Sequence, residues 1–209
     1  MIQIKNLTKQ YKAGKPIFSD YSNQFEGGTG VGVVGPNGSG KTTFLRIISV
    51  NSFPTSGKVL FNDSDVHEKP SDFLKHVGLV HDEENLPIHL TAVELLEWVI
   101  RSRNRWSDKS EKEINDLFDS LSLTIDDRNE QIGTYSTGMK KKVQIAAAFI
   151  LKPKVFIMDE PLRGLDTSSR EVVIKLVETA KINGALVFMS SHTMESLSEL
   201  FDEMIEFPL

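Results

Sequence analysis

The chain has 209 residues, of which 39% are hydrophobic and 25% charged, so it is long enough for one globular domain with a subdomain. Its net charge of −5 at pH 7 does not favour nucleic acid as a partner. It contains no cysteine, which excludes disulfides and thiolate metal sites, and its longest apolar stretch, near residues 145–151, is too short to span a membrane.

The N-terminal third of the sequence is predicted to form strands joined by turns. Ile2 and Ile4 alternate with polar neighbours, which is typical of a strand with one buried face. Residues 17–25 form a second candidate strand that leads into a glycine turn. Two further candidates are residues 57–63, bounded by turn residues, and the short apolar run 77–80, which favours a buried strand.

The middle of the sequence changes to helical spacing. Thr91 is a candidate N-cap, and Glu94 completes a capping box for the helix that follows. Residues 109–121 repeat apolar side chains on one helical face. We therefore expect a helical insert over about residues 86–129, within a helical subdomain of about residues 86–150.

The last third of the sequence alternates strands and helices. Residues 155–158 are apolar throughout, which indicates a strand covered on both faces. A helix is predicted over residues 171–182, a central strand over 185–189 and another helix over 194–200. Such alternation favours a mostly parallel sheet, in which ligands bind at the carboxyl ends of the strands.

Residues 35–43 read Gly-Pro-Asn-Gly-Ser-Gly-Lys-Thr-Thr, which contains the phosphate-loop pattern Gly-x4-Gly-Lys-Thr. The glycines let backbone N–H groups point towards a polyphosphate, Lys41 supplies a cation, and the Thr42 hydroxyl is a ligand for Mg²⁺. An accidental glycine-rich turn is the alternative, but the loop stands between an apolar run and a helix start, whose N-terminus favours anions. The residues that we assign to binding the polyphosphate are Gly35, Asn37, Gly38, Ser39, Gly40, Lys41, Thr42 and Thr43.

Two carboxylates follow the predicted strand at residues 155–158. Asp159 is suited to hold Mg²⁺, through water, and Glu160 is suited to orient or deprotonate an attacking water. A strand that ends in two solvated acids is common by itself. The phosphate loop in the same chain favours the catalytic interpretation.

The order of these motifs resembles that of the ATP-binding subunits of ABC transporters. Residues 135–140, Tyr-Ser-Thr-Gly-Met-Lys, stand ahead of Asp159 where this family carries its signature, usually Leu-Ser-Gly-Gly-Gln. The resemblance covers essentially the whole chain and rests on the joint order of the motifs. It implies an α/β P-loop NTPase fold with a mostly parallel core sheet, an N-terminal antiparallel β subdomain and a helical insert subdomain, in one domain over residues 1–209.

The resemblance also assigns roles to isolated side chains. Tyr11 matches the aromatic residue that stacks on adenine, Asp166 matches the D-loop aspartate at the nucleotide site, and His192 matches the switch histidine that contacts the γ-phosphate. Taken alone, Tyr11 could be a half-buried strand residue and His192 a structural one. The groups expected to be catalytic are Glu160, His192 and Lys41.

The signature departs from the usual pattern of the family. Thr137 and Met139 replace Gly and Gln, which resembles the variant in ATPases that serve ABC-2-type export permeases. Ser136 and Gly138, the two positions expected to contact the γ-phosphate, are kept, although Ser136 alone is also a common helix N-cap. The cations at residues 140–142 are predicted to lie on a solvated face.

The family's Q-loop glutamine is also replaced. Alignment of residues 77–80 puts Asp82 at this position, where a carboxylate can still hold Mg²⁺ or its water through oxygen. Asp82 lacks the donor of an amide, so we expect the coupling of this loop to the nucleotide to differ.

The resemblance implies a head-to-tail dimer of identical or different ATPase subunits, with two ATP molecules in the interface. Each ATP, with Mg²⁺, would contact the Lys41 loop of one subunit and the Ser136 helix of the other. The dimer would power a separate transmembrane permease, for export, from the cytoplasmic face of the cell membrane, and no nucleic acid partner is expected. The loop after Asp82, with apolar residues 86–88, is a candidate permease contact. No C-terminal regulatory domain is expected after the last predicted strand.

Three other functions compete with this one. A soluble ABC-type ATPase that remodels DNA or ribosomes usually carries coiled coils, a second cassette or basic segments, and none is visible in this sequence. A P-loop kinase or other NTPase would not need the motifs at Ser136 and His192. A nucleotide sensor without turnover would not need Glu160.

Overall fold

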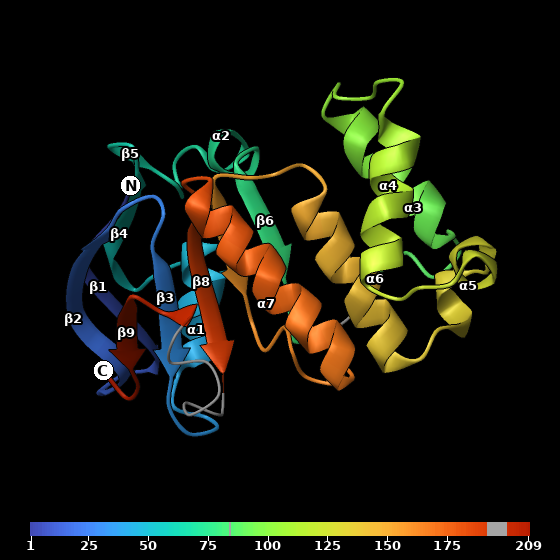
Figure 1. The fold of residues 1–209 in the computed structure, drawn as a ribbon. Coiled ribbons are helices and arrows are strands. Elements are labelled where there is room, and N and C mark those ends of the chain that lie inside the picture. The colour runs from blue at the N-terminus through green and yellow to red at the C-terminus, as the bar shows by residue number, and fades with distance from the viewer. Residues whose placement is uncertain (84, 192–199) are drawn as a thin grey trace.

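The computed structural model describes residues 1–83, 85–191 and 200–209, and it shows two β-sheets with helices packed against them (Figure 1). The first sheet is antiparallel, as the fold class predicted, with the strand order β2-β1-β4-β5. Its strands are β1 (Ile2–Lys12), β2 (Lys15–Phe25), β4 (Ser56–Phe61) and β5 (Ser64–Asp65).

The second sheet is parallel in every pairing, and its strand order is β6-β7-β8-β3-β9. Its strands are β3 (Gly30–Val34), β6 (Val77–Val80), β7 (Val155–Met158), β8 (Leu186–Ser191) and β9 (Glu203–Glu206). In β7, Val155 and Ile157 face one hydrophobic core, whereas Phe156 and Met158 face another. This confirms the prediction of a strand covered on both faces at residues 155–158. Such a strand is apolar throughout because each face packs against a hydrophobic core.

The described helices follow the predicted spacing in the middle of the chain. They are α1 (Lys41–Ile48), α2 (Pro70–Leu74), α3 (Ala92–Ser102), α4 (Ser110–Ser120), α5 (Ile125–Asn129), the 3-10 helix η1 (Ile132–Thr134), α6 (Thr137–Phe149) and α7 (Thr167–Ile182). The Thr91 hydroxyl accepts from the Glu94 N–H at 3.1 Å, and the Glu94 carboxylate accepts from the Thr91 N–H at 2.9 Å, which confirms the capping box. Within the part of the chain that the structure describes, every helix is too short or too polar to pass through a bilayer.

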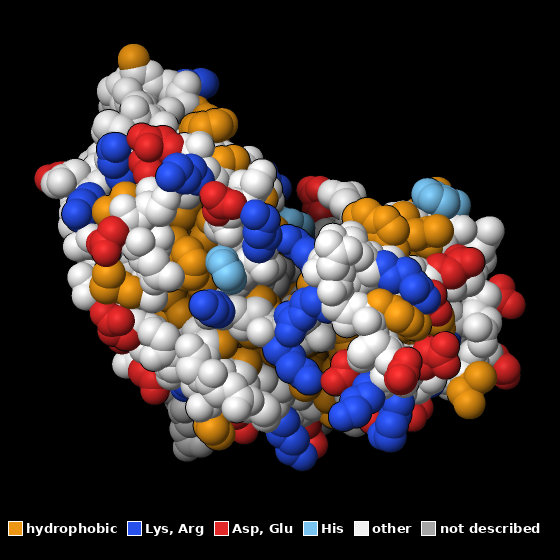
Figure 2. Space-filling view, turned by 90° about the horizontal axis from the view of Figure 1, so that it is seen from above, with side chains coloured by type: hydrophobic (Ala, Val, Ile, Leu, Met, Phe, Trp, Pro, Cys, Tyr) orange, Lys and Arg blue, Asp and Glu red, His pale blue; other side chains and the backbone are white. Residues whose placement is uncertain are grey.

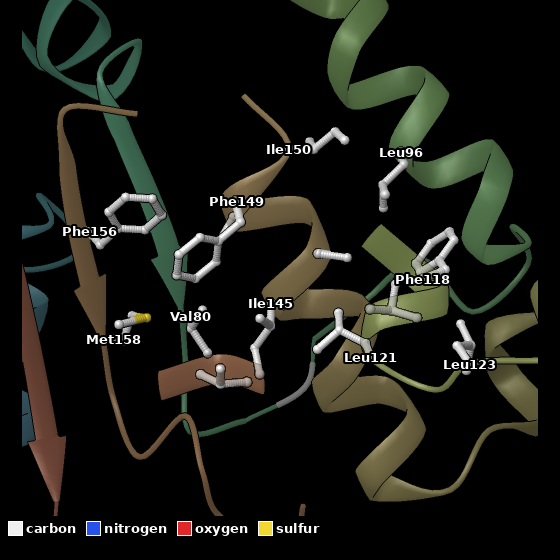
Figure 3. Close-up of a cluster of buried hydrophobic side chains, with 14 of the residues drawn as sticks. Val80, Leu96, Phe118, Leu121, Leu123, Ile145, Phe149, Ile150, Phe156 and Met158 are labelled. Carbon is white, nitrogen blue, oxygen red and sulfur yellow. The ribbon is translucent and has the colours of Figure 1, made fainter. Parts of the chain in front are cut away.

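Two hydrophobic cores lie on opposite faces of the parallel sheet. One joins the antiparallel sheet and α1 to the face that carries Val155 and Leu186. The other joins α3, α4, α6 and α7 to the face that carries Phe156 and Val187. Figure 3 shows α6 between the sheet and α4, where Phe149 stacks on Phe156 with ring centroids 4.3 Å apart. A continuous core therefore attaches the helical end of the molecule to the sheet.

Several boundaries differ from the sequence prediction. Helix α7 begins at Thr167 rather than residue 171, because the Asp166 carboxylate accepts from the Ser169 N–H and caps the helix. Strand β9 and helices α2 and α5 were not predicted, since these segments of four or five residues mix polar and apolar side chains and are too short to show a period. The helix predicted over residues 194–200 falls mostly outside the described residues.

Arginines at the edge where the parallel strands begin also join the two ends of the molecule. Figure 2 views this edge and shows Lys and Arg side chains gathered where the sheets meet the helical end. Arg103 Nη2 donates to the carbonyl oxygen of Leu74 at 3.1 Å, and Arg105 Nη1 donates to that of Leu151 at 2.6 Å. The phosphate loop, Asp159 and Glu160 follow the carboxyl ends of the strands and so lie at the opposite edge.

Candidate active site

The carboxyl ends of β3, β6, β7 and β8 meet at one edge of the parallel sheet. Parallel strands place the segments that follow them side by side, and this is the edge at which α/β proteins bind ligands. The segments that leave these ends are the phosphate loop, His81-Asp82, Asp159-Glu160 and the end of β8 at Ser190-Ser191.

Two glycines allow the phosphate loop to pack closely against its surroundings. Gly40 is the N-cap of α1 with φ of 114°, and a Cβ atom there would lie 2.4 Å from Ile17 Cγ2. Gly35 has φ of 144°, and a Cβ atom there would lie 2.6 Å from the carbonyl oxygen of Phe207. Ser39 Oγ is buried without a hydrogen-bond partner among the described residues.

Lys41 is buried at the start of α1 beside a cavity of about 360 Å³. Its ammonium group donates to the carbonyl oxygens of Gly35 at 2.7 Å and Pro36 at 3.0 Å. Most of the predicted phosphate-loop residues share this cavity with Glu160. The cavity is lined by Ile17, Asn37, Gly38, Gly40, Lys41, Thr42, Thr43, Asp82, Glu160 and Arg163.

Ser190 joins the two predicted carboxylates. Its hydroxyl donates to Asp159 Oδ1 at 2.6 Å and accepts from the backbone N–H of Glu160 at 2.9 Å. Asp159 is only 6% exposed. Glu160 has φ of 48°, a left-handed conformation that is costly for a residue with a side chain. The surrounding structure therefore fixes the backbone direction at both acids.

Asp82 lines two cavities, that of Lys41 and a second one of about 170 Å³ that also contains Asp159. Arg163 Nη1 lies 2.7 Å from Asp82 Oδ1 and 3.0 Å from Oδ2. Burial lowers the pKa of the neighbouring His81, and the charge of Arg46 adds to the effect. The lowered pKa favours the neutral form of the His81 ring.

The donor set suits Mg²⁺. The Thr42 hydroxyl and the Asp159 and Asp82 carboxylates could supply oxygen ligands, which this ion prefers. Within residues 1–83, 85–191 and 200–209, no three His, Cys, Asp or Glu side chains gather as a complete metal site.

The predicted signature lies outside the Lys41 cavity. Ser136 is the N-cap of α6, as predicted for a helix start, and its Oγ accepts from the Met139 N–H at 3.2 Å. Of the described residues that line the cavity, none is Ser136 or Gly138. Gly138 instead faces the loop after Glu160, where a Cβ atom would lie 2.9 Å from the carbonyl oxygen of Gly164.

Asp166 directs its carboxylate into its own helix. It accepts from the Ser169 N–H at 2.8 Å and from the hydroxyls of Ser168 and Ser169 at 2.7 and 3.0 Å. These bonds, the backbone N–H first, hold the pKa of Asp166 well below its usual range, and Lys142 Nζ lies 3.3 Å away. Asp166 is thus the cap of α7, and its contact with nucleotide stays a prediction.

The prediction of a solvated face at residues 140–142 is wrong for two of the three lysines. Lys141 is 1% exposed and Lys142 is 8% exposed. Lys141 Nζ donates to the carbonyl oxygens of His81 at 2.6 Å and Asp82 at 3.1 Å. α6 packs beside β6, so this cation reaches backbone acceptors that a sequence pattern does not reveal.

Tyr11, which was predicted to stack on adenine, is not among the described residues that line the Lys41 cavity. Tyr11 is 67% exposed near the end of β1, with Lys9 Nζ 4.8 Å from its ring centroid. The stacking of Tyr11 on adenine stays a prediction, and Ile17 is the apolar side chain among the described residues that line the cavity. His192 lies outside the described residues.

Three contributors were missed by sequence reasoning, namely Ser190, Arg163 and Lys141. Ser190 is the second-last residue of a buried strand and lies at the ligand-binding edge, so its position in the sequence could have indicated a role. The two cations gave no signal, since an arginine in a polar loop and a lysine in a basic run are both usually exposed.

Comparison with known proteins agrees with this fold. The sequence profile of the family described as "ABC transporter" matches residues 18–163. The fold and the site therefore define an ATP-binding cassette, a domain that binds and hydrolyses ATP. The chain belongs to the family of ABC transporter ATP-binding proteins.

Several curated proteins are similar over nearly the whole chain. ABC transporter ATP-binding protein NatA of Bacillus subtilis is 30% identical, with 98% of this chain and 85% of NatA covered. Uncharacterized ABC transporter ATP-binding protein YybJ of the same organism is 32% identical, with 99% and 92% covered. Doxorubicin resistance ATP-binding protein DrrA of Mycobacterium tuberculosis is 27% identical, and the chain spans 62% of its length.

Solved structures give the same fold. The ATP-binding cassette MJ0796, in a dimeric post-hydrolysis state bound to ADP and Pi, superposes with a TM-score of 0.87 at 26% identity, covering 99% of this chain and 94% of that one. An ATP-binding subunit of an ABC transporter superposes with a TM-score of 0.91 at 24% identity, covering 99% and 85%, and supports the fold alone.

Proposed function

We propose that the chain powers a separate membrane permease, as the ATPase subunit of an ABC-2-type exporter, in a dimer that holds two ATP molecules between its subunits. The supporting observation is the division of the predicted site. Lys41 and Glu160 line one cavity, whereas Ser136 and Gly138 lie outside it. A second, identical or closely related copy, turned head-to-tail, would supply its own Ser136, and the similar cassette MJ0796 is dimeric.

Each residue of the cavity has a role in this proposal. Lys41 would exchange the loop carbonyl oxygens for phosphate oxygens. Thr42 and Asp159, with Asp82, would hold Mg²⁺, which neutralises charge on the phosphates when bound. Glu160 would orient or deprotonate the attacking water. The buried position of Asp159 and the fixed backbone of Glu160 support this division of roles.

Exposed apolar side chains support contact with a permease. Ile88, in the loop predicted to make this contact, is 63% exposed, and Trp98 on α3 is also 63% exposed. Exposed apolar groups of this size are common at interaction sites. DrrA, a relative named for doxorubicin resistance, favours export. In this proposal the protein works on the cytoplasmic face of the cell membrane, attached to the permease.

The dimer is tested with the Glu160→Gln variant, which should bind ATP but hydrolyse it slowly. With ATP and Mg²⁺, gel filtration with light scattering should show a dimer, and with ADP a monomer. Adding Ser136→Arg should prevent the dimer, whereas Ser102→Arg at the exposed end of α3 should leave it intact. A monomer under every nucleotide condition would overturn the shared site.

The partner is tested by purifying the chain from membranes under mild detergent. We expect a membrane protein to co-purify and to raise the ATPase rate when added back. Recovery with ribosomes or DNA instead would overturn the transport role and leave the ATPase assignment intact.

A further inference from the structure

An ion pair crosses the wall of the nucleotide cavity. Arg163 Nη1 lies 2.7 Å from Asp82 Oδ1 and 3.0 Å from Oδ2, although the two residues are 81 positions apart in the chain. Asp82 follows β6, whereas Arg163 lies in the loop after β7, where its backbone N–H donates to the Glu160 carbonyl oxygen at 3.2 Å. The pair therefore connects the two loops that carry the predicted acids.

Both partners face the cavity that Lys41, Thr42 and Glu160 line. A group that enters this cavity meets a second cation besides Lys41, and that cation is now neutralised by Asp82. The pair engages Nη1, one nitrogen of a guanidinium group that has five donors. Arg163 can therefore accept a new anionic partner without a change in the backbone.

The pair is weakly held. The Arg163 side chain is 65% exposed and that of Asp82 is 37% exposed. Exposed ion pairs add little stability, whereas bonds from arginine to phosphate are charge-assisted and strong. A carboxylate is also a preferred ligand of Mg²⁺. A magnesium triphosphate thus offers a stronger interaction to each residue, phosphate for Arg163 and Mg²⁺ for Asp82. Breaking the ion pair costs little stability in exchange.

We propose that Arg163 is a second phosphate-binding cation of this site, and that Asp82 masks it until Mg²⁺ arrives. This inference rests on the proposed function, in which ATP and Mg²⁺ occupy the cavity. When Asp82 turns to the metal, Arg163 is released to the triphosphate. Without Mg²⁺, Asp82 competes with ATP for Arg163 and also repels the phosphates. The pair thereby makes ATP affinity depend on the metal through a residue that is not a metal ligand.

The test measures the Kd for ATP, by equilibrium titration with a fluorescent analogue, in EDTA and in Mg²⁺. Arg163→Gln should weaken ATP binding in Mg²⁺ roughly tenfold, the value of one lost charge-assisted bond. Asp82→Asn should strengthen ATP binding in EDTA roughly threefold to tenfold, because it frees Arg163. The matched control is Lys175→Gln, which removes an exposed cation of α7 outside the cavity and should leave both Kd values unchanged.

The double variant separates masking from simple repulsion. If Asp82 acts through Arg163, Asp82→Asn brings no gain in EDTA when Arg163→Gln is already present. An equal gain in both backgrounds would overturn the masking role, and an unchanged Kd in Arg163→Gln would overturn Arg163 as a phosphate ligand. Normal ATP binding by the unaltered protein in the same titrations shows that such a failure concerns the ion pair, whereas absent ATP binding would overturn the proposed function itself.

Discussion

The ammonium nitrogen of Lys141 lies 2.6 Å from the carbonyl oxygen of His81, 60 residues earlier in the chain. The same group donates to the Asp82 carbonyl oxygen at 3.1 Å, and one turn further along α6 the Gln144 amide donates to that of Glu83 at 3.3 Å. The start of α6 therefore holds three successive carbonyl groups of the segment after β6. Because this segment carries Asp82, a movement of α6 would move one wall of the nucleotide cavity.

Replacing Lys141 by Met keeps the length of the side chain but removes its donors. We expect the free energy of unfolding to fall by about 1–3 kcal/mol, since carbonyl groups at this packed junction lose their partner. Urea unfolding followed by intrinsic fluorescence measures the change. Lys140→Met, at the half-buried neighbour, is the control and should shift stability by less than about 0.5 kcal/mol. Equal losses in the two variants would contradict a specific role for Lys141.

The Glu160→Gln variant should separate ATP binding from hydrolysis. The amide keeps the shape of the side chain but cannot accept a proton, so we expect phosphate release to slow by roughly 10²–10⁴ while ATP affinity is kept. A coupled phosphate assay and a nucleotide titration measure the two quantities. Glu178→Gln on the exposed face of α7 should leave both unchanged. Turnover at the normal rate would remove Glu160 from the role of general base.

Ser190 is expected to act as a positioning residue for the two acids. Ser190→Ala removes the donor to Asp159 and the acceptor for the Glu160 N–H, so kcat should fall roughly tenfold while KM for ATP changes little. Ser190→Thr, which keeps the hydroxyl, should recover much of the rate. A merely structural role would instead lower the unfolding midpoint and leave kcat per folded molecule intact.

The Asp166 cap should make stability depend on pH at the acid end. Because its hydrogen bonds lower the folded-state pKa below the unfolded value of about 3.9, its contribution is complete above that value and is lost as pH falls through the folded-state pKa. The urea midpoint of the unaltered protein should exceed that of Asp166→Asn at neutral pH, and the gap should narrow below about pH 4. The urea midpoint of Asp166→Ser, which has a neutral capping residue, should depend less on pH than that of the unaltered protein. A gap that is the same in acid and at neutral pH would contradict the charged cap.

Much of the fold followed from local pattern. The apolar run at residues 155–158 indicated a strand buried on both faces from its composition alone, and the capping box at Thr91 and Glu94 involves residues that are neighbours in the chain. The phosphate loop was equally readable, because its glycines and Lys41 act within a few residues of one another. The resemblance to the family rested on the order in which the motifs follow one another in the chain.

What escaped prediction depends on contacts between distant segments. Lys141 is buried because α6 lies against the segment after β6, and nothing in a run of three lysines indicates which one turns inward. Arg163 and Asp82 meet only because β6 and β7 are adjacent in the sheet. From the sequence alone, each is an ordinary charged loop residue, and their pairing could not be predicted without the strand order.

The tight approach of Gly138 to Gly164 joins the first turn of α6 to the loop after Glu160, and the Lys142–Asp166 pair adds a second link a few residues on. The start of α6, which would face a neighbouring copy, is therefore in direct contact with the loop that follows Glu160 in the same subunit. In the proposed dimer, a change at the nucleotide bound near Glu160 could therefore affect the nucleotide that contacts α6 of the same subunit. The two nucleotide sites would then be coupled rather than independent.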